Sequence, residues 1–150
     1  MAKKIKKPIA LETDINKNLY YICIFVTIVT MAMGTIEFFS RGIFFPNRMN
    51  LFYLGVLLIY TIHKELIRWL GQAKVERKGE VFVYSWVVLT TLLYVVNFLS
   101  KDFYSYMPQG GPSTSLRDMS IIALEVLALF ILTRCLKIIK LGAKAKNIRS

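Results

Sequence analysis

The stretch that decides the fold is Val81–Ser100, which reads VFVYSWVVLTTLLYVVNFLS and contains no charged residue. A helix needs about 20 predominantly apolar residues to cross the hydrocarbon core of a bilayer. The run is continuous, whereas a transmembrane strand would alternate apolar and polar residues. This segment therefore predicts a membrane-spanning helix.

Three further apolar runs predict similar helices, so that we expect spans at about 19–39, 47–65, 81–100 and 118–139. Pro46 favours the start of the second helix, because proline suits a first turn. The second apolar run ends at Ile62, but an apolar side of the helix containing Ile59, Ile62 and Leu66 continues beyond it. We therefore expect a cytoplasmic extension of the second helix. The predicted fold is all-α, a single integral membrane four-helix bundle over 1–150 with short loops.

Composition limits the chemistry that the chain can perform. It combines 150 residues, 55% of them hydrophobic, with a formal net charge of +11. One His and two Cys do not build the usual zinc or haem sites, and His63 alone supports no Ser-His-Asp arrangement. No glycine-rich phosphate loop or nucleic-acid recognition module is present in the sequence. We therefore expect no enzymatic activity, metal, cofactor or nucleic-acid partner.

Lysine and arginine predict the orientation of the spans. Sixteen of the 20 basic residues fall in the N-terminal tail, the segment between the second and third spans, and the C-terminal segment. The other four are Arg41, Arg48, Lys101 and Arg117. The positive-inside rule places the basic side in the cytoplasm. We expect a multi-pass protein of the plasma or inner membrane with both termini cytoplasmic (N-in, C-in), and Trp86 near the inner boundary.

Polar residues follow one side of the first span at intervals of three and four, a spacing that keeps them on one helical face. They are Cys23, Thr27, Thr30, Gly34, Glu37 and Arg41. Small residues let a neighbouring helix approach closely, and hydroxyls can bond across the contact. Thr27, Thr30 and Gly34 are therefore the predicted helix-packing positions, and Glu37 and Arg41 are spaced to pair with each other.

Further polar residues on the third and fourth spans predict one intramembrane cluster in the outer half of the bundle. Its expected members are Glu37, Glu125, Asn97, Tyr94, Thr90 and Arg41, with Arg117 as an alternative counter-ion. A charged carboxylate at the depth of Glu125 costs roughly 2.5–3.5 kcal/mol, so it must be protonated or paired. One interpretation is a proton or cation site; the other is a buried contact that fixes helix register or binds a partner subunit.

The C-terminal segment carries Lys137, Lys140 and Lys144 on one helical side. We expect these lysines to form a basic, lipid-facing surface that attracts anionic lipids of the inner leaflet. Two other interpretations remain, an acidic soluble partner and a purely topological role for the charges.

These features predict a non-enzymatic membrane subunit or scaffold. Its small and polar helix faces would bind other membrane helices, either copies of itself (a homo-oligomer) or a partner membrane protein in a larger complex. The alternative is a small proton- or cation-coupled transporter or channel centred on Glu125. A third class, an enzyme acting on lipid, has only the outer polar cluster in its favour.

Overall fold

The structure is a computed structural model that describes residues 6–43, 49–69 and 79–149, with side chains described at 15–43, 49–69, 79–140 and 142. The described chain is helical. It forms α1 (Lys6–Phe39), α2 (Met49–Trp69), α3 (Gly79–Leu99), the short 3-10 helix η1 (Phe103–Ser105) and α4 (Ser115–Arg149). Each of the four long helices contains a segment long and apolar enough to cross a membrane: Ile15–Phe39, Met49–Trp69, Gly79–Leu99 and Ser115–Lys140. The prediction of an all-α fold with four such helices is confirmed, and the helices suggest a multi-pass membrane protein.

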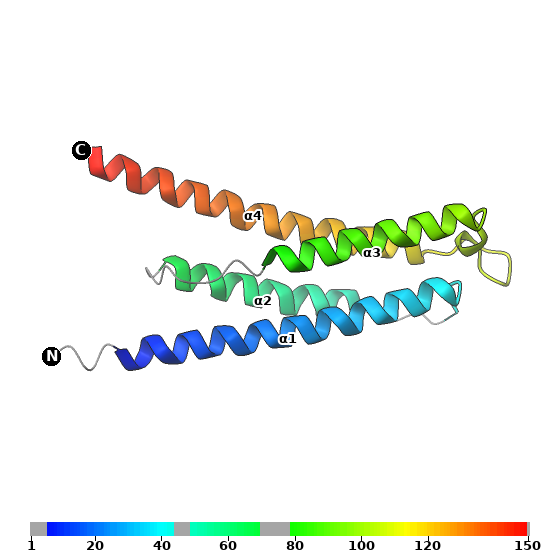
Figure 1. Cartoon of the computed structure of the whole chain (residues 1–150), viewed down its shortest axis with the longest axis horizontal. Coiled ribbons are helices and arrows are strands. Elements are labelled where there is room, and N and C mark those ends of the chain that lie inside the picture. The colour runs from blue at the N-terminus through cyan, green and yellow to red at the C-terminus, as the bar shows by residue number, and fades with distance from the viewer. Residues whose placement is uncertain (1–5, 44–48, 70–78, 150) are drawn as a thin grey trace.

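The four helices run side by side, and each is antiparallel to the next along the chain (Figure 1). α1 begins and α4 ends at the same end of the bundle, which we call the termini end. The turn after α1 and the loop containing η1 lie at the opposite end, the loop end. α3 packs most extensively on α4, and α1 on α2, while α4 also contacts α1 and α2. α4 is therefore in contact with all three other helices.

The centre of the bundle is held by an aromatic pair from α2 and α3. The Trp86 indole N–H donates a hydrogen bond of 2.7 Å to the Tyr53 hydroxyl, and their ring centroids lie 5.5 Å apart. Trp86 is 0% exposed. A partner on α2 thus satisfies the indole N–H inside the bundle, and the depth expected for Trp86 stays a prediction.

The polar side of α1 faces the other helices. Cys23, Thr27, Thr30, Gly34 and Glu37 are all buried. The hydroxyl groups of Thr27 and Thr30 both donate within their own helix. Each donates to the carbonyl four residues earlier on α1, Thr27 to Cys23 at 2.6 Å and Thr30 to Val26 at 2.8 Å. The Thr30 hydroxyl is thus satisfied within its own helix, whereas the Thr27 hydroxyl also shares a side-chain hydrogen bond with Tyr53 of α2.

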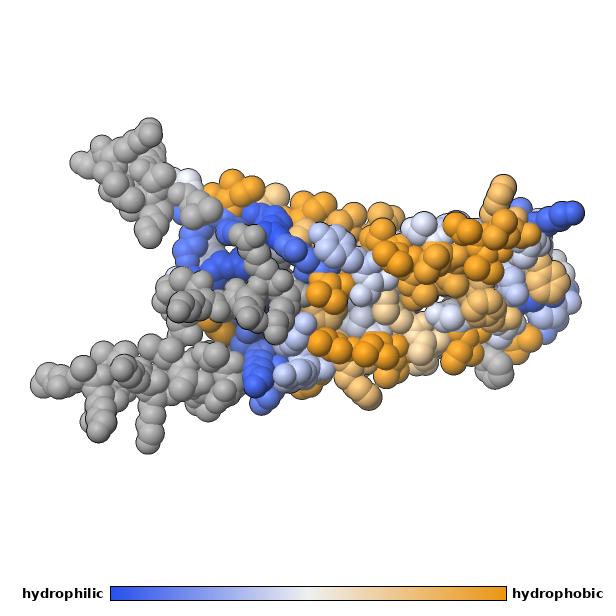
Figure 2. Space-filling model, in the orientation of Figure 1, coloured by the Kyte–Doolittle hydropathy of each residue, from blue (hydrophilic) through white to orange (hydrophobic). Residues whose placement is uncertain are grey.

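The surface of the bundle is largely apolar. Large hydrophobic side chains such as Phe25, Leu51 and Phe98 are exposed, the last at 80%. Figure 2 shows hydrophobic residues over much of the visible face, with hydrophilic residues gathered toward both ends. Soluble monomers rarely carry a contiguous apolar surface of this extent.

Gly34 supplies a first test of this packing. A Cβ atom at Gly34 would overlap the Met119 sulfur of α4, whereas a Cβ at Gly55 of α2 would meet open space. We expect Gly34→Ala to lower the free energy of unfolding by about 1 kcal/mol, because the buried Met119 side chain must shift and this cost exceeds the helix-propensity gain of alanine. Gly55→Ala is the matched control and should raise it by up to about 1 kcal/mol, because alanine favours helix. Unfolding in neutral detergent micelles measures both, and equal effects would contradict the α1–α4 packing.

Candidate functional site

The expected intramembrane cluster divides into separate sites, the first of which surrounds Glu37. Glu37 is buried, and its Oε1 has no hydrogen-bond partner among the described residues. It lines a cavity of about 10 Å³ together with Thr30, Asn50 and Asp118. A volume near 10–15 Å³ is what one water needs. Arg41 does not pair with Glu37 as expected; its Nε donates to the Tyr106 carbonyl at 2.7 Å, at the loop end.

The α3 members of the expected cluster have other partners. The Asn97 amide donates to Asp102 Oδ1 at 2.8 Å and to Ser105 Oγ at 2.9 Å, and so fastens the loop to the end of α3. The exposed Tyr94 shares a hydrogen bond of 2.9 Å with Ser120 of α4. Thr90 is buried, and its hydroxyl has no partner among the described residues. These residues organise the α3–α4 contact and the loop, and they do not gather around a single group.

Glu125 is exposed, so its carboxyl group lies on the outside of the bundle. It belongs to a row of exposed α4 residues at intervals of four and three, which we call the α4 seam. The seam consists of Ile121, Glu125, Ala128, Leu132, Cys135 and Ile139. This alternation is the heptad spacing by which one helix packs along another. The structure thus separates Glu125 from Glu37 and places it on an outward helix-packing face.

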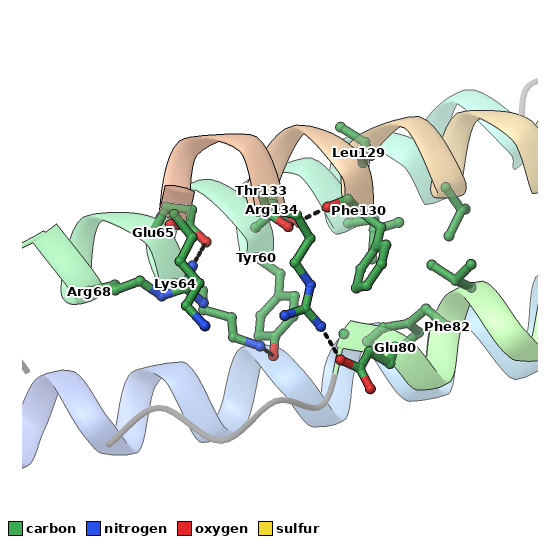
Figure 3. A pocket seen from close by; sticks show the side chains of 16 residues that line it. Tyr60, Lys64, Glu65, Arg68, Glu80, Phe82, Leu129, Phe130, Thr133 and Arg134 are labelled. Atoms are coloured by element: carbon green, nitrogen blue, oxygen red, sulfur yellow. Dashed lines mark hydrogen bonds and ion pairs between the residues drawn. The ribbon is translucent and has the colours of Figure 1, made fainter. Parts of the chain in front are cut away.

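A second polar region lies between α2, α3 and α4 toward the termini end. It is a cavity of about 80 Å³, which we call the terminal pocket. Figure 3 shows Lys64, Arg68 and Arg134 grouped around it, with Phe82 and Leu129 on its apolar side. Its remaining charged lining residues are Glu65, Glu80 and Lys137.

Each acidic residue of the terminal pocket is already paired with an arginine. Glu65 accepts a bond of 2.5 Å from Arg68, one turn along α2. Glu80 at the start of α3 pairs with Arg134 of α4, and the Arg134 guanidinium lies 4.8 Å from the Phe130 ring centroid. The Glu80–Arg134 pair ties α3 to α4, the Glu65–Arg68 pair lies within α2, and each carboxylate faces one guanidinium.

Lys64 has no such partner. It is 8% exposed, and its Nζ lies 3.4 Å from the Tyr60 hydroxyl. Among the described residues, no ion pair joins Lys64 or Lys137 to a carboxylate. With two arginines balanced by two acids, the terminal pocket therefore carries two uncompensated positive charges. A buried charge is unfavourable unless it is paired.

The apolar side of α2 faces outward beside this pocket. Ile59, Ile62 and Leu66 are exposed, at 51–60%, while Lys64 and Glu65 face the bundle. This is the reverse of a helix at a water-facing surface, whose apolar face packs on the core. Residues 70–78, where the expected cytoplasmic extension would end, lie outside the described residues.

The lysines of the expected basic, lipid-facing surface are described in part, and their contact with lipid stays a prediction. Lys137 lines the terminal pocket. Lys140 reaches across to α2, where its Nζ donates to the Arg68 carbonyl at 2.5 Å and lies 5.8 Å from the Trp69 ring centroid. The side chain of Lys144 lies outside the described residues. Sequence spacing placed these lysines on one side of α4 but did not show that α2 covers that side.

Comparison with known proteins gives no further guide to the site: no family model, curated protein or solved structure matches the chain. Within the described part of the chain, no three His, Cys, Asp or Glu side chains gather as a metal site would require. The chemistry of the α4 seam and the terminal pocket therefore rests on their own geometry.

The uncompensated charge of Lys64 makes a prediction about stability. We expect Lys64→Met to raise the free energy of unfolding by about 1 kcal/mol or more, because methionine fills similar space without a buried cation. Lys140→Met is the matched control and should lower it by about 0.5–1.5 kcal/mol, because the Arg68 carbonyl loses its donor. Unfolding of delipidated protein in neutral detergent and phosphate-free buffer measures both. A larger loss for Lys64→Met than for Lys140→Met would contradict this description of the pocket.

Proposed function

We propose that the protein is a non-enzymatic integral membrane subunit whose α4 seam binds the α4 seam of a second copy. The observation that carries this proposal is the exposed carboxyl group of Glu125 in the middle of an apolar helix. Both the membrane environment and the partner are argued below.

Charge and amphipathicity support a membrane orientation with both termini in the cytoplasm. The described basic residues Lys64, Arg68, Arg134 and Lys137 lie toward the termini end, and the positive-inside rule places such an end in the cytoplasm of a plasma or inner membrane. The outward side of α2 remains apolar as far as Leu66, beside the inward Lys64 and Glu65. That arrangement suits lipid around the helix and polar groups inside it. It also brings the charged termini end to the anionic inner leaflet.

Depth makes Glu125 the residue that needs a partner. It lies ten residues after Ser115, which corresponds to about 15 Å along the axis at 1.5 Å per residue. Counted from Asp118, where the expected span begins, the depth is about 10 Å, within the outer half of a hydrocarbon core about 30 Å thick. An isolated charged side chain there costs roughly 2.5–3.5 kcal/mol. Protonation lowers this cost, but the acid still needs a hydrogen-bond partner because lipid offers none.

The α4 seam offers a surface on which such a partner would fit. Its heptad spacing suits a parallel pair of helices, and Ala128 beside Glu125 permits close approach. A second copy inserts with the same orientation, so the two α4 helices are parallel and the two Glu125 side chains meet at equal depth. Two protonated carboxyl groups satisfy each other, because each has one donor and one free acceptor. A symmetric contact of one surface with itself closes as a dimer.

The native cysteines provide the test. Cys135 is on the α4 seam and exposed, whereas Cys23 is buried in the bundle. In a parallel α4 pair, Cys135 faces its counterpart, so mild oxidation of native membranes should give a cross-linked species at twice the 17.3 kDa chain mass. Cys23→Ser should keep this species and Cys135→Ser should remove it. A chain that stays uncross-linked and monomeric under oxidation would overturn the proposed dimer.

Glu125 variants test the polar contact itself. Glu125→Leu should weaken the dimer about 5- to 30-fold, since interhelical hydrogen bonds in model membrane peptides contribute about 1–2 kcal/mol. Glu125→Gln should preserve it, because an amide both donates and accepts. Leu124→Ala is the control, an exposed α4 residue outside the seam. Equal dimerisation of Glu125→Leu and Leu124→Ala in lipid titrations would contradict the role given to Glu125.

The transporter centred on Glu125 is not proposed. Glu125 lines neither the terminal pocket nor the cavity beside Glu37. A carboxyl group on the outer side of α4 has no path through the bundle to serve.

A further inference from the structure

The terminal pocket holds more positive charge than the fold itself needs. Glu80–Arg134 and Glu65–Arg68 account for both carboxylates, so Lys64 and Lys137 remain without an acidic partner among the described residues. Lys64 is also buried at 8% exposure. Burial of an unpaired ammonium group weakens a protein, and such a group is kept where a negative ligand compensates it.

The donors around the cavity suit a phosphate group. Each arginine has five N–H donors in a planar fork, and the pairs described above use only part of that capacity. Arg68, Arg134 and the two lysines approach one cavity from two helices, α2 and α4. A volume of about 80 Å³ is several times the 10–15 Å³ that one water needs. The space therefore fits a polyatomic oxyanion better than a single small ion.

Polarity changes along the axis of the pocket. On α2 the lining passes from Leu57 through Thr61 to Lys64 and Arg68, and on α4 it passes from Val126 to Lys137. Both helices run toward the termini end. The charged lining residues therefore lie near that end, and the apolar lining residues lie closer to the middle of the bundle. A ligand that carries an anionic group next to an apolar chain matches this order.

We propose that the terminal pocket is a binding site for a phosphate group, supplied by the headgroup of an anionic phospholipid. Lys64 and Lys137 neutralise its charge, and the free N–H groups of Arg68 and Arg134 donate to its oxygens. The apolar wall formed by Leu57 and Val126 receives the first part of the lipid's chain. Free phosphate shares this chemistry but not the match to the apolar wall.

The experiment uses the full-length protein in neutral detergent, with dioctanoyl phosphatidylglycerol, dioctanoyl phosphatidylcholine and inorganic phosphate as separate probes. Thermal stability is followed against the concentration of each. The anionic lipid should raise the midpoint saturably, and the zwitterionic lipid should bind more weakly. Lys64→Gln and Lys137→Gln should each weaken the binding of the anionic lipid about tenfold, as expected for one charged hydrogen bond.

Lys17→Gln is the matched control, because Lys17 is an exposed α1 lysine outside the pocket. The Lys17→Gln variant should bind dioctanoyl phosphatidylglycerol with the same affinity as the native chain. Equal weakening by all three lysine variants would indicate a diffuse basic surface and overturn the site. Binding of inorganic phosphate as tight as that of the lipid, and equally dependent on Lys64, would keep the phosphate site but reject the lipid as its source. Failure of both anionic probes to saturate would overturn the proposal entirely.

Discussion

The proposed membrane setting imposes one constraint on the molecule: lipid offers no hydrogen bonds, so a polar group needs its partner inside the protein. The threonine hydroxyls of α1 return to carbonyls of their own helix, and Trp86 finds Tyr53. On α2, Lys64 turns inward while Leu66 turns outward. Apolar side chains then cover the outside of the bundle (Figure 2). Such a surface is stable in lipid and a liability in water.

Some buried atoms, such as Glu37 Oε1 and the Thr90 hydroxyl, have no partner among the described residues, and the two proposals concern two further groups that lack a counter-charge within one chain. Glu125 is polar and faces outward, so its partner has to come from another molecule. Lys64 is charged and faces inward without an acid, so its partner has to enter the bundle. The two sites use different sides of α4, because Glu125 belongs to the seam and Arg134 and Lys137 line the pocket. A dimer formed at the seam would therefore leave the pocket unobstructed.

The helices could be predicted from the sequence. The candidate sites could not, because their membership depends on which helix faces pack against each other. Twenty-residue apolar runs gave four helices long and apolar enough to cross a membrane, and three-four spacing identified one face of α1. Spacing alone does not say what lies opposite a face. Spacing therefore predicts one polar cluster that contains both Glu125 and Glu37. The rotation of α4 instead places Glu125 on the outer surface of the bundle. The terminal pocket was missed because its charges come from separate segments, and the available signal was that Lys64 and Arg68 lie opposite the apolar side of α2.

The claim on which both proposals rest is that the bundle spans a membrane with its basic termini end in the cytoplasm. Small epitope tags at the two ends of the chain, probed with antibodies in sealed right-side-out vesicles, test it directly. We expect both tags to stay hidden until the vesicles are opened, and then to become accessible together. Tags reached from opposite sides of the sealed vesicle, or a chain that stays monodisperse in buffer without detergent, would contradict it.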